Sequence, residues 1–238
     1  MKPFFSGLIC LLLVFSCKTE KNETPITEEK KEQTIAEKIA NAHGFENWKN
    51  VEEVKFTFKV DRDTIKGKGR SWIWNPKQDN VTMRAGETTV TYNRSQMDST
   101  HISADRGFIN DKYWLLVPFQ LVWDTSATIS KPQKAESPVA KEQLDMITIL
   151  YANQGGYTPG DAYDIYYDDN YMIKEWVFRK GNSVEPTLTN TFENYIDYNG
   201  IKIATDHKKD GGSVDLNFTE VRITLSELNY GIAVGPCN

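Results

Sequence analysis

The residue types that most often carry chemistry are few and scattered in this chain of 238 residues. Its three histidines lie far apart, His43 at the end of an expected helix and His101 and His207 on expected strands, and none has a partner at the spacing of a metal-binding motif. Acid–base catalysis by histidine also needs a second group to orient the ring, and no such pattern is present. We therefore expect surface histidines, or buried ones with satisfied hydrogen bonds.

Acidic and hydroxyl side chains do not form a recognisable catalytic site either. Four aspartates, Asp161, Asp164, Asp168 and Asp169, lack the order of oxygen ligands and the closing glutamate of an EF-hand, which favours a solvated hairpin. The sequence has no Gly-x-Ser-x-Gly turn, and the glycine pair at 155–156 is not followed by the Lys-Ser/Thr of a phosphate loop. We predict no catalytic residue, no metal and no cofactor, and a protein that is not an enzyme.

Aromatic side chains are the most informative residues, with 6 Trp, 11 Tyr and 11 Phe. Small-molecule pockets are commonly lined by hydrophobic and aromatic side chains. The same side chains also fill the core of a wide curved sheet, so a packing role is the alternative. The candidates for a cavity lining are Trp72, Trp74, Tyr113, Trp114, Phe119, Trp123 and Trp176.

The N-terminus has the pattern of a secretion leader. A positively charged start is followed by an apolar run over residues 4–15, which is short for a helix that crosses roughly 30 Å of hydrocarbon. The run ends in Val-Phe-Ser-Cys at 14–17, which resembles the lipobox of bacterial lipoproteins. We predict a signal peptide over 1–16 and lipidation of Cys17. A plain signal peptide and an N-terminal anchor helix are the alternatives.

The residues after Cys17 indicate a tether and a location. Residues 18–33 are rich in Lys, Glu and Thr and contain no aromatic residue, so they cannot bury enough apolar surface to become ordered. We therefore predict a disordered tether over 17–34 and a single folded domain over 35–238. Lys18 stands where an Asp would favour inner-membrane retention. We expect a protein of the cell envelope, held at the outer membrane by several acyl chains.

Charge and cysteine content exclude several other classes. The 28 Lys and Arg against 33 Asp and Glu give a net charge of -5 without a basic stripe, so nucleic acid is not an expected partner. Cys10 leaves with the leader, Cys17 carries lipid and Cys237 remains alone, which excludes an internal disulfide. A content of 39% hydrophobic and 26% charged residues excludes a wholly disordered chain.

Alternating hydrophobicity predicts a body dominated by antiparallel strands. A short amphipathic helix over 35–43 ends at Gly44, and period-two patterns then take over. Asn199-Gly200 is a strong hairpin signal. The expected strands are 54–61, 64–74, 80–84, 88–93, 145–151, 162–167, 171–179, 191–198, 201–208 and 214–225.

Two segments interrupt this pattern. Residues 106–123 form an apolar block of mixed period that contains Pro118, and we expect a short helix running into an extended segment that covers the sheet. Residues 131–141 contain two prolines and little apolar content, which predicts a surface loop.

Aromatic segments in three places carry a resemblance to a known family. They are Ile-Asn-Asp-Lys-Tyr-Trp-Leu-Leu-Val-Pro-Phe at 109–119, Asp-Ala-Tyr-Asp-Ile-Tyr-Tyr-Asp at 161–168 with Lys-Glu-Trp-Val-Phe at 174–178, and Asn-Gly-Ile-Lys-Ile at 199–203. Their succession over residues 35–225 resembles the superfamily of Lol-type lipoprotein carriers (LolA-like and LolB-like proteins), which includes the N-terminal domain of the anti-sigma regulator RseB.

The resemblance agrees with the fold class that the pattern predicts. We expect a mainly β protein with few helices (α+β). A strongly curved antiparallel sheet of about ten or eleven strands would form a half-open barrel, with short helices covering its concave side. Relatives hold acyl chains or other hydrophobic ligands on that concave face, and this implication is carried by analogy.

We predict a membrane-anchored, non-enzymatic lipoprotein that binds a lipid or another hydrophobic small molecule in the half barrel. Two alternatives belong to other classes. One is a carbohydrate-binding surface lipoprotein, in which exposed Trp and Tyr side chains stack on sugar rings. The other is an envelope sensor or assembly module that binds a protein partner through a sheet edge.

Overall fold

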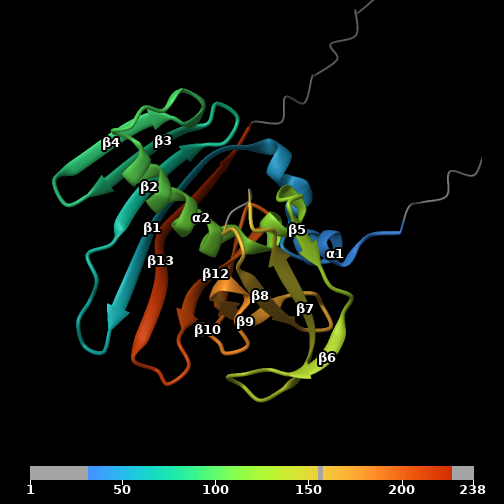
Figure 1. Cartoon of the computed structure of the whole chain (residues 1–238). Helices are drawn as coiled ribbons and strands as arrows, with labels where there is room; N and C mark the ends of the chain where they lie inside the picture. Colours follow the sequence, from blue (N-terminus) through green and yellow to red (C-terminus); the bar gives the residue numbers. More distant parts are fainter. Residues whose placement is uncertain (1–31, 155–157, 227–238) are drawn as a thin grey trace, which may run out of the picture. The chain divides into compact units, whose positions relative to one another are not determined.

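Antiparallel strands account for most of the fold in the computed structural model, which describes residues 32–154 and 158–226 (Figure 1). The described part contains thirteen strands, two α-helices and three short 3-10 helices. The predicted mainly β fold with few helices is confirmed. The predicted leader, Cys17 and the tether as far as residue 31 lie outside the described residues, as does the tail from residue 227.

The larger sheet has seven strands in the order β11-β12-β13-β1-β2-β3-β4. Its inner face is built from alternate apolar residues such as Phe56, Trp72 and Phe218, which are buried. The strand bounds are β1 Val51–Arg62, β2 Arg70–Asn75, β3 Asn80–Ala85, β4 Thr88–Asn93, β11 Glu193–Tyr198, β12 Ile201–Lys208 and β13 Val214–Leu225.

A β-bulge bends this sheet at its central pair of strands. The register of β1 against β13 shifts between Lys55 and Thr57, opposite Glu220. Glu220 has a left-handed backbone with a φ of 54°. An extra residue in one strand of an antiparallel pair increases the local twist and bends that strand. The extra residue in β13 therefore accounts for part of the curvature that we expected of the sheet.

The smaller sheet has the order β10-β9-β8-β7-β5, and β6 also pairs with β7. Two expectations are corrected here. The segment 131–141, expected to be a loop, contains a short strand, and the single strand expected over 191–198 is two strands that are separated at Phe192. The bounds are β5 Ala127–Ile129, β6 Gln133–Glu136, β7 Gln143–Tyr151, β8 Ala162–Tyr167, β9 Ile173–Arg179 and β10 Leu188–Thr191.

The two sheets meet along one seam, where β10 passes β12. Asn190 forms an isolated bridge with Lys209, and the Asp210 N–H donates to the Thr189 carbonyl over 3.1 Å. Within the described ranges no ladder joins β4 to β5, so the sheets are not closed into a full barrel. The expected half-open arrangement is present, built from thirteen strands in two adjoining sheets.

Helix α1 (Ile35–Ala42) begins and ends as its sequence indicates. Thr34 and Glu37 form a reciprocal capping box at its N-terminus. Gly44 follows with a φ of 87°, and a Cβ built there would lie 1.8 Å from the Gly200 carbonyl oxygen. Only glycine fits this close approach of α1 to the β11–β12 turn.

Helix α2 (Ile102–Trp123) differs from the expectation for this segment. Its 22 residues form one kinked helix rather than a short helix followed by an extended segment, and His101 precedes the helix instead of lying on a strand. Leu116 leaves helical geometry because Pro118 has no N–H for the Trp114 carbonyl. In the described ranges, no helix combines the length and the apolar character needed to span a bilayer.

A buried carboxylate fixes α2 to the seven-stranded sheet. Arg70 donates to Asp111 from Nε over 3.0 Å and from Nη2 over 2.6 Å. The Trp72 indole N–H donates to the same carboxylate over 2.8 Å, and Asn110 Nδ2 donates over 3.0 Å. Burial raises the pKa of Asp111, while these four donors favour its ionised form. The group thus sets the rotation of α2 about its own axis.

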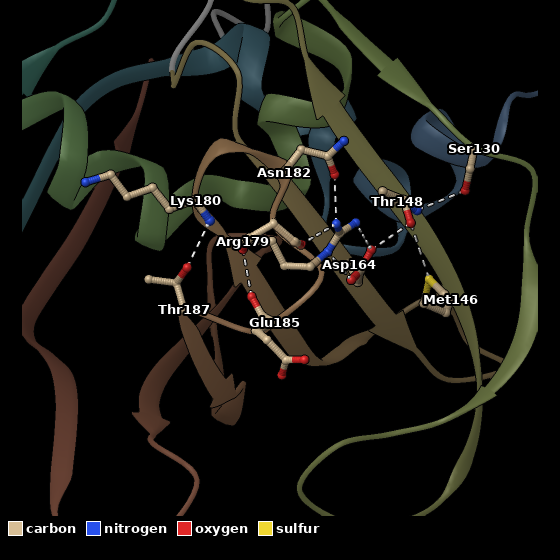
Figure 2. A network of polar contacts seen from close by, with 10 residues as sticks. Ser130, Met146, Thr148, Asp164, Arg179, Lys180, Asn182, Glu185 and Thr187 are labelled. Carbon is tan, nitrogen blue, oxygen red and sulfur yellow. Dashed lines mark hydrogen bonds and ion pairs between the residues drawn. The ribbon is translucent and has the colours of Figure 1, made fainter.

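A polar network ties together the outer face of the smaller sheet (Figure 2). Arg179 donates to Asp164 from Nε over 2.9 Å and from Nη2 over 3.2 Å, and Thr148 donates to Asp164 over 2.7 Å. Arg179 also donates to the side chain of Asn182 over 2.7 Å. The network joins β7, β8 and β9 to η3 (Lys180–Asn182). It braces these strands from the side opposite the core.

Two of the three histidines are fully buried, at places where elements meet. His43 caps α1 and donates from Nδ1 to the Ile39 carbonyl, and His207 donates from Nδ1 to the Thr191 carbonyl at the seam. Burial lowers the pKa of each ring to about 4. Both are therefore neutral at pH 7 and have a structural role.

We predict that the protein loses stability as the pH falls from 7.5 to 5.5. The unfolded chain binds protons at His43 and His207 with a pKa near 6.5, whereas the folded chain resists protonation until about pH 4. The stabilisation is therefore present above pH 6.5 and is lost as the pH falls toward 4. The loss of stability at pH 5.5, relative to pH 7.5, amounts to about 1 kcal/mol per histidine. Guanidinium unfolding at both pH values measures it. His207→Gln should reduce the difference, and an equal difference in this variant contradicts the assignment.

We also predict that Asp111→Asn destabilises the fold by about 2 to 3 kcal/mol, because it leaves the partly buried Arg70 without its counter-charge. Asp169→Asn is the matched control, since the Asp169 side chain is 94% exposed and lies 3.7 Å from Lys134 Nζ. The free energy of unfolding from denaturant titration checks both variants. Equal stability of the two would show that the Asp111 contacts do not hold α2.

Candidate functional site

A cavity of about 430 Å³ lies between α2 and the inner face of the smaller sheet. Its volume falls within the usual range for small-molecule pockets, about 300 to 1,000 Å³. Four other surface hollows of 380 to 450 Å³ have a larger share of charged, amide and hydroxyl side chains. The cavity is lined by Arg106, Ile109, Asn110, Tyr113, Trp114, Thr158, Tyr163, Trp176, Phe178 and Leu188.

Aromatic rings from both sides build its wall. Trp114 of α2 lies against Trp176 of β9, with ring centroids 4.2 Å apart. Tyr163 of β8 lies 5.2 Å from Trp176 and 5.0 Å from Phe178. Tilted and offset contacts of this kind are favourable beyond the area that they bury. The wall is therefore a set of rings held by one another rather than a row of independent side chains.

Hydroxyl groups hold the helix to the sheet on this side. The hydroxyls of Tyr113 and Tyr151 are 3.1 Å apart and buried, and those of Thr158 and Tyr163 are 3.3 Å apart. Burial raises the pKa of Tyr151 to about 12 and raises that of Tyr163 as well. These phenols stay protonated at neutral pH, so they act as hydrogen-bonding groups and not as bases.

The polar residues of the cavity lie on its α2 side and near Thr158. Arg106 and Asn110 are exposed, one helical turn apart, and Tyr113 follows on the same face. Arg106 is the one charged side chain among the ten described lining residues. The arrangement suits an apolar or amphiphilic molecule, and it offers no acid–base pair.

Three of the seven residues predicted to line a cavity do line this one. They are Tyr113, Trp114 and Trp176. The other four, Trp72, Trp74, Phe119 and Trp123, lie outside this cavity, and Trp72 lines one of the other hollows. Trp72 is 1% exposed and donates its indole N–H to Asp111, so it belongs to the attachment of α2.

The remaining three fill the end of the larger sheet together with η1 (Phe45–Asn50). Trp48 of η1 lies 4.8 Å from Trp123, 5.5 Å from Trp74 and 5.6 Å from Phe119. Lys112 Nζ lies 5.4 Å from the Trp74 ring centroid, and burial lowers the pKa of this lysine to about 8. These rings are packing residues of the core, which was the alternative interpretation.

Several lining residues were not predicted from the sequence. Tyr163, Phe178 and Leu188 come from three different strands, and nothing in their local pattern sets them apart from other strand residues. Arg106, Ile109 and Asn110 follow the spacing of one helix face with Tyr113 and Trp114. The short helix expected at the start of 106–123 already has this spacing, but the sequence does not show which of its faces borders a cavity.

The described residues contain no group of three or more His, Cys, Asp or Glu side chains placed to hold a metal ion. His207 contacts the far side of the aromatic wall, 5.5 Å from Trp114, where it is fully buried. The indole N–H of Trp176 has no hydrogen-bond partner among the described residues. The chemistry that these side chains support is binding of an apolar group.

No protein-family model matches the sequence, and no curated protein matches it. Among solved structures, the chain is similar to a DUF1329 family protein from Desulfovibrio piger, at 8% identity with a TM-score of 0.44, covering 84% of this chain and 92% of that one. It is also similar to a LolA superfamily protein from Nitrosomonas europaea, at 8% identity with a TM-score of 0.43, covering 81% and 94%. A third is an outer-membrane lipoprotein-sorting protein domain from Vibrio parahaemolyticus, at 10% identity with a TM-score of 0.44, covering 79% and 93%.

Proposed function

We propose that this protein is a lipid-anchored, non-enzymatic protein of the cell envelope that binds a lipid or another hydrophobic small molecule. The observation that carries the proposal is the aromatic cavity between α2 and the smaller sheet. Its support comes from the side chains of this chain and not from the similarity to other structures.

The cavity wall supports binding through burial of apolar surface. Ile109, Phe178 and Leu188 supply aliphatic and aromatic surface around the Trp114 and Trp176 pair. Each methylene group of a ligand that leaves water for such a site contributes about 0.8 kcal/mol. A short hydrocarbon segment is therefore enough for measurable affinity, without any charged contact.

The absence of catalysis belongs to the same proposal. Around the cavity, the titratable groups with shifted pKa values are tyrosines that burial keeps protonated. His207 is held neutral behind the wall and donates to a main-chain carbonyl. Neither a nucleophile with an adjacent base nor a paired acid and base lines the cavity among the described residues.

The anchor is proposed from the sequence alone. The apolar run 4–15 and the Val-Phe-Ser-Cys at 14–17 support lipidation of Cys17. Several acyl chains on one residue hold a protein at a membrane without a spanning helix. The charged residues that follow support an outer-membrane location and a tether between the anchor and the folded body.

The carbohydrate-binding alternative has less support from the side chains that it requires. Stacking on a sugar ring needs an aromatic face open to solvent. Four of the six tryptophans, Trp72, Trp74, Trp114 and Trp176, are less than 9% exposed, and Trp48 and Trp123 are partly buried against the core. The interaction of an envelope protein with a sheet edge stays a prediction.

We predict that residues 17–238 carrying Cys17→Ser, produced without the leader 1–16 and purified without detergent, retain a hydrophobic molecule that native mass spectrometry detects. This protein has neither the attached acyl chains nor the apolar run of the leader, so any bound lipid occupies the fold itself. Ile109→Trp should abolish the bound mass, because the larger ring fills the cavity from α2. Ile102→Trp is the matched control on the same helix, since Ile102 is 45% exposed and outside the cavity lining.

The outcomes separate the cavity from other sites. A bound mass in the control that is lost in Ile109→Trp supports the proposal. An unliganded mass in the parent protein, together with no binding of an added fluorescent fatty acid, contradicts it. Equal occupancy in both Trp variants places the ligand elsewhere.

We predict that Cys17→Ser abolishes the incorporation of labelled palmitate into the protein in growing cells, because it removes the sulfur atom on which lipidation begins. Cys237→Ser should keep the label and controls for loss of a thiol. Metabolic labelling with immunoprecipitation checks both variants, and density-gradient separation of the membranes checks the outer-membrane location of the unsubstituted protein. An unsubstituted protein that takes up no label contradicts the lipid anchor.

A further inference from the structure

Arg106 has an unusual position at the candidate cavity. It lies on the first turns of α2, is exposed, and lines a space whose other walls are largely aromatic and aliphatic. Within the described residues its guanidinium makes no hydrogen bond and no ion pair. The two other arginines close to this part of the core form ion pairs, Arg70 with Asp111 and Arg94 with Asp105.

The helix geometry directs Arg106 to the same space as the aromatic wall. Residues three and four apart share one face of a helix, which places Arg106 above Ile109 and Asn110, and these above Tyr113. The Asn110 amide is held by its hydrogen bond to Asp111, which fixes this face relative to the larger sheet. A positive group therefore lies at one end of an apolar surface.

This pairing of groups matches one class of ligand. An apolar ligand without a charge gains nothing from a guanidinium, and a fully charged ligand gains nothing from Trp114 and Trp176. An amphiphile gains from both, because its chain is removed from water while its head stays at the exposed end. Arginine presents a planar set of donors that matches a carboxylate or a phosphate in a bidentate manner.

We propose that the cavity selects anionic amphiphiles, with the apolar chain between α2 and the smaller sheet and a carboxylate or phosphate head paired with Arg106. The proposal rests on the proposed function, since it names the ligand class of the same cavity. Arg106 acts as the specificity-determining residue. The net charge of the chain is -5, so the overall charge does not favour an anion and the preference is assigned to the local positive group.

The test compares three ligands with the same twelve-carbon chain, dodecanoate, dodecyl phosphate and dodecanol, each below its aggregation concentration. Binding to residues 17–238 carrying Cys17→Ser, produced without the leader 1–16, is followed by titration calorimetry at pH 7.5. Both anions should bind about two- to fivefold more tightly than the alcohol, as expected for one exposed charge pair. Comparison of the two anions separates a fatty-acid head from a phosphate head.

Variants at Arg106 isolate the head-group contact. Arg106→Gln should reduce the affinity for both anions to that for dodecanol and leave dodecanol unchanged, and Arg106→Lys should retain part of the preference. Arg84→Gln is the matched control, because Arg84 is an exposed arginine on β3 outside the cavity lining. Since Arg106 is exposed, we expect its replacement to leave the fold intact, and circular dichroism of each variant checks this.

The results distinguish the two levels of the proposal. Equal affinity of the acid and the alcohol, or a preference for anions that survives Arg106→Gln, overturns the role of Arg106 while hydrophobic binding stands. No binding of any of the three ligands overturns both. A preference for anions that is lost in Arg106→Gln and kept in Arg84→Gln supports the inference.

Discussion

The attachment of α2 by the Asp111 carboxylate is the interaction on which the rest of the arrangement depends. Asp111 has no exposed surface, and a buried carboxylate is tolerated only where donors replace the water that it has lost. Arg70, Trp72 and Asn110 supply these donors from β2 and from α2 itself. Because the helix is fixed on this side, Tyr113 and Trp114 face the smaller sheet, and the cavity forms there.

The aromatic side chains of the core have two roles in two different regions, close packing in one and the lining of a cavity in the other. Around Trp48 and Trp123 the rings pack against one another at one end of the larger sheet. Around Trp176 the rings of α2 and of the smaller sheet meet at angles that do not fill the space completely. Protein interiors are close-packed, so a hollow of this size among large rings is unusual. The region around Trp176 is therefore the better candidate for a binding site.

The sequence predicted the strands well, because their pattern is local. The two hairpin turns, at Asn170 and at Gly200, lie where the turn residues predict them. Alternating hydrophobicity also predicts the positions of β3, β4, β8, β12 and β13. Helix α2 was harder, since Pro118 usually ends a helix, and here tertiary packing on both sides keeps the chain helical through the kink. The cavity itself lies between α2 and the strands β8 to β10, which come much later in the chain. Three of its residues were nevertheless found by their aromatic type.

The strand order also determines when each part of the fold becomes available. The smaller sheet is built from one continuous stretch of chain, β5 to β10, whereas the larger sheet pairs β1 near the start with β13 near the end. Val51 finds Leu225 only after the whole body has been synthesised, and pairings of such long range form slowly. Until β13 is synthesised, β1 to β4 can form only part of the larger sheet, and the edge of β1 that pairs with β13 has no partner strand. An unpaired edge of this kind can pair with strands of other chains, so β1 is a site of possible mispairing until β13 is made.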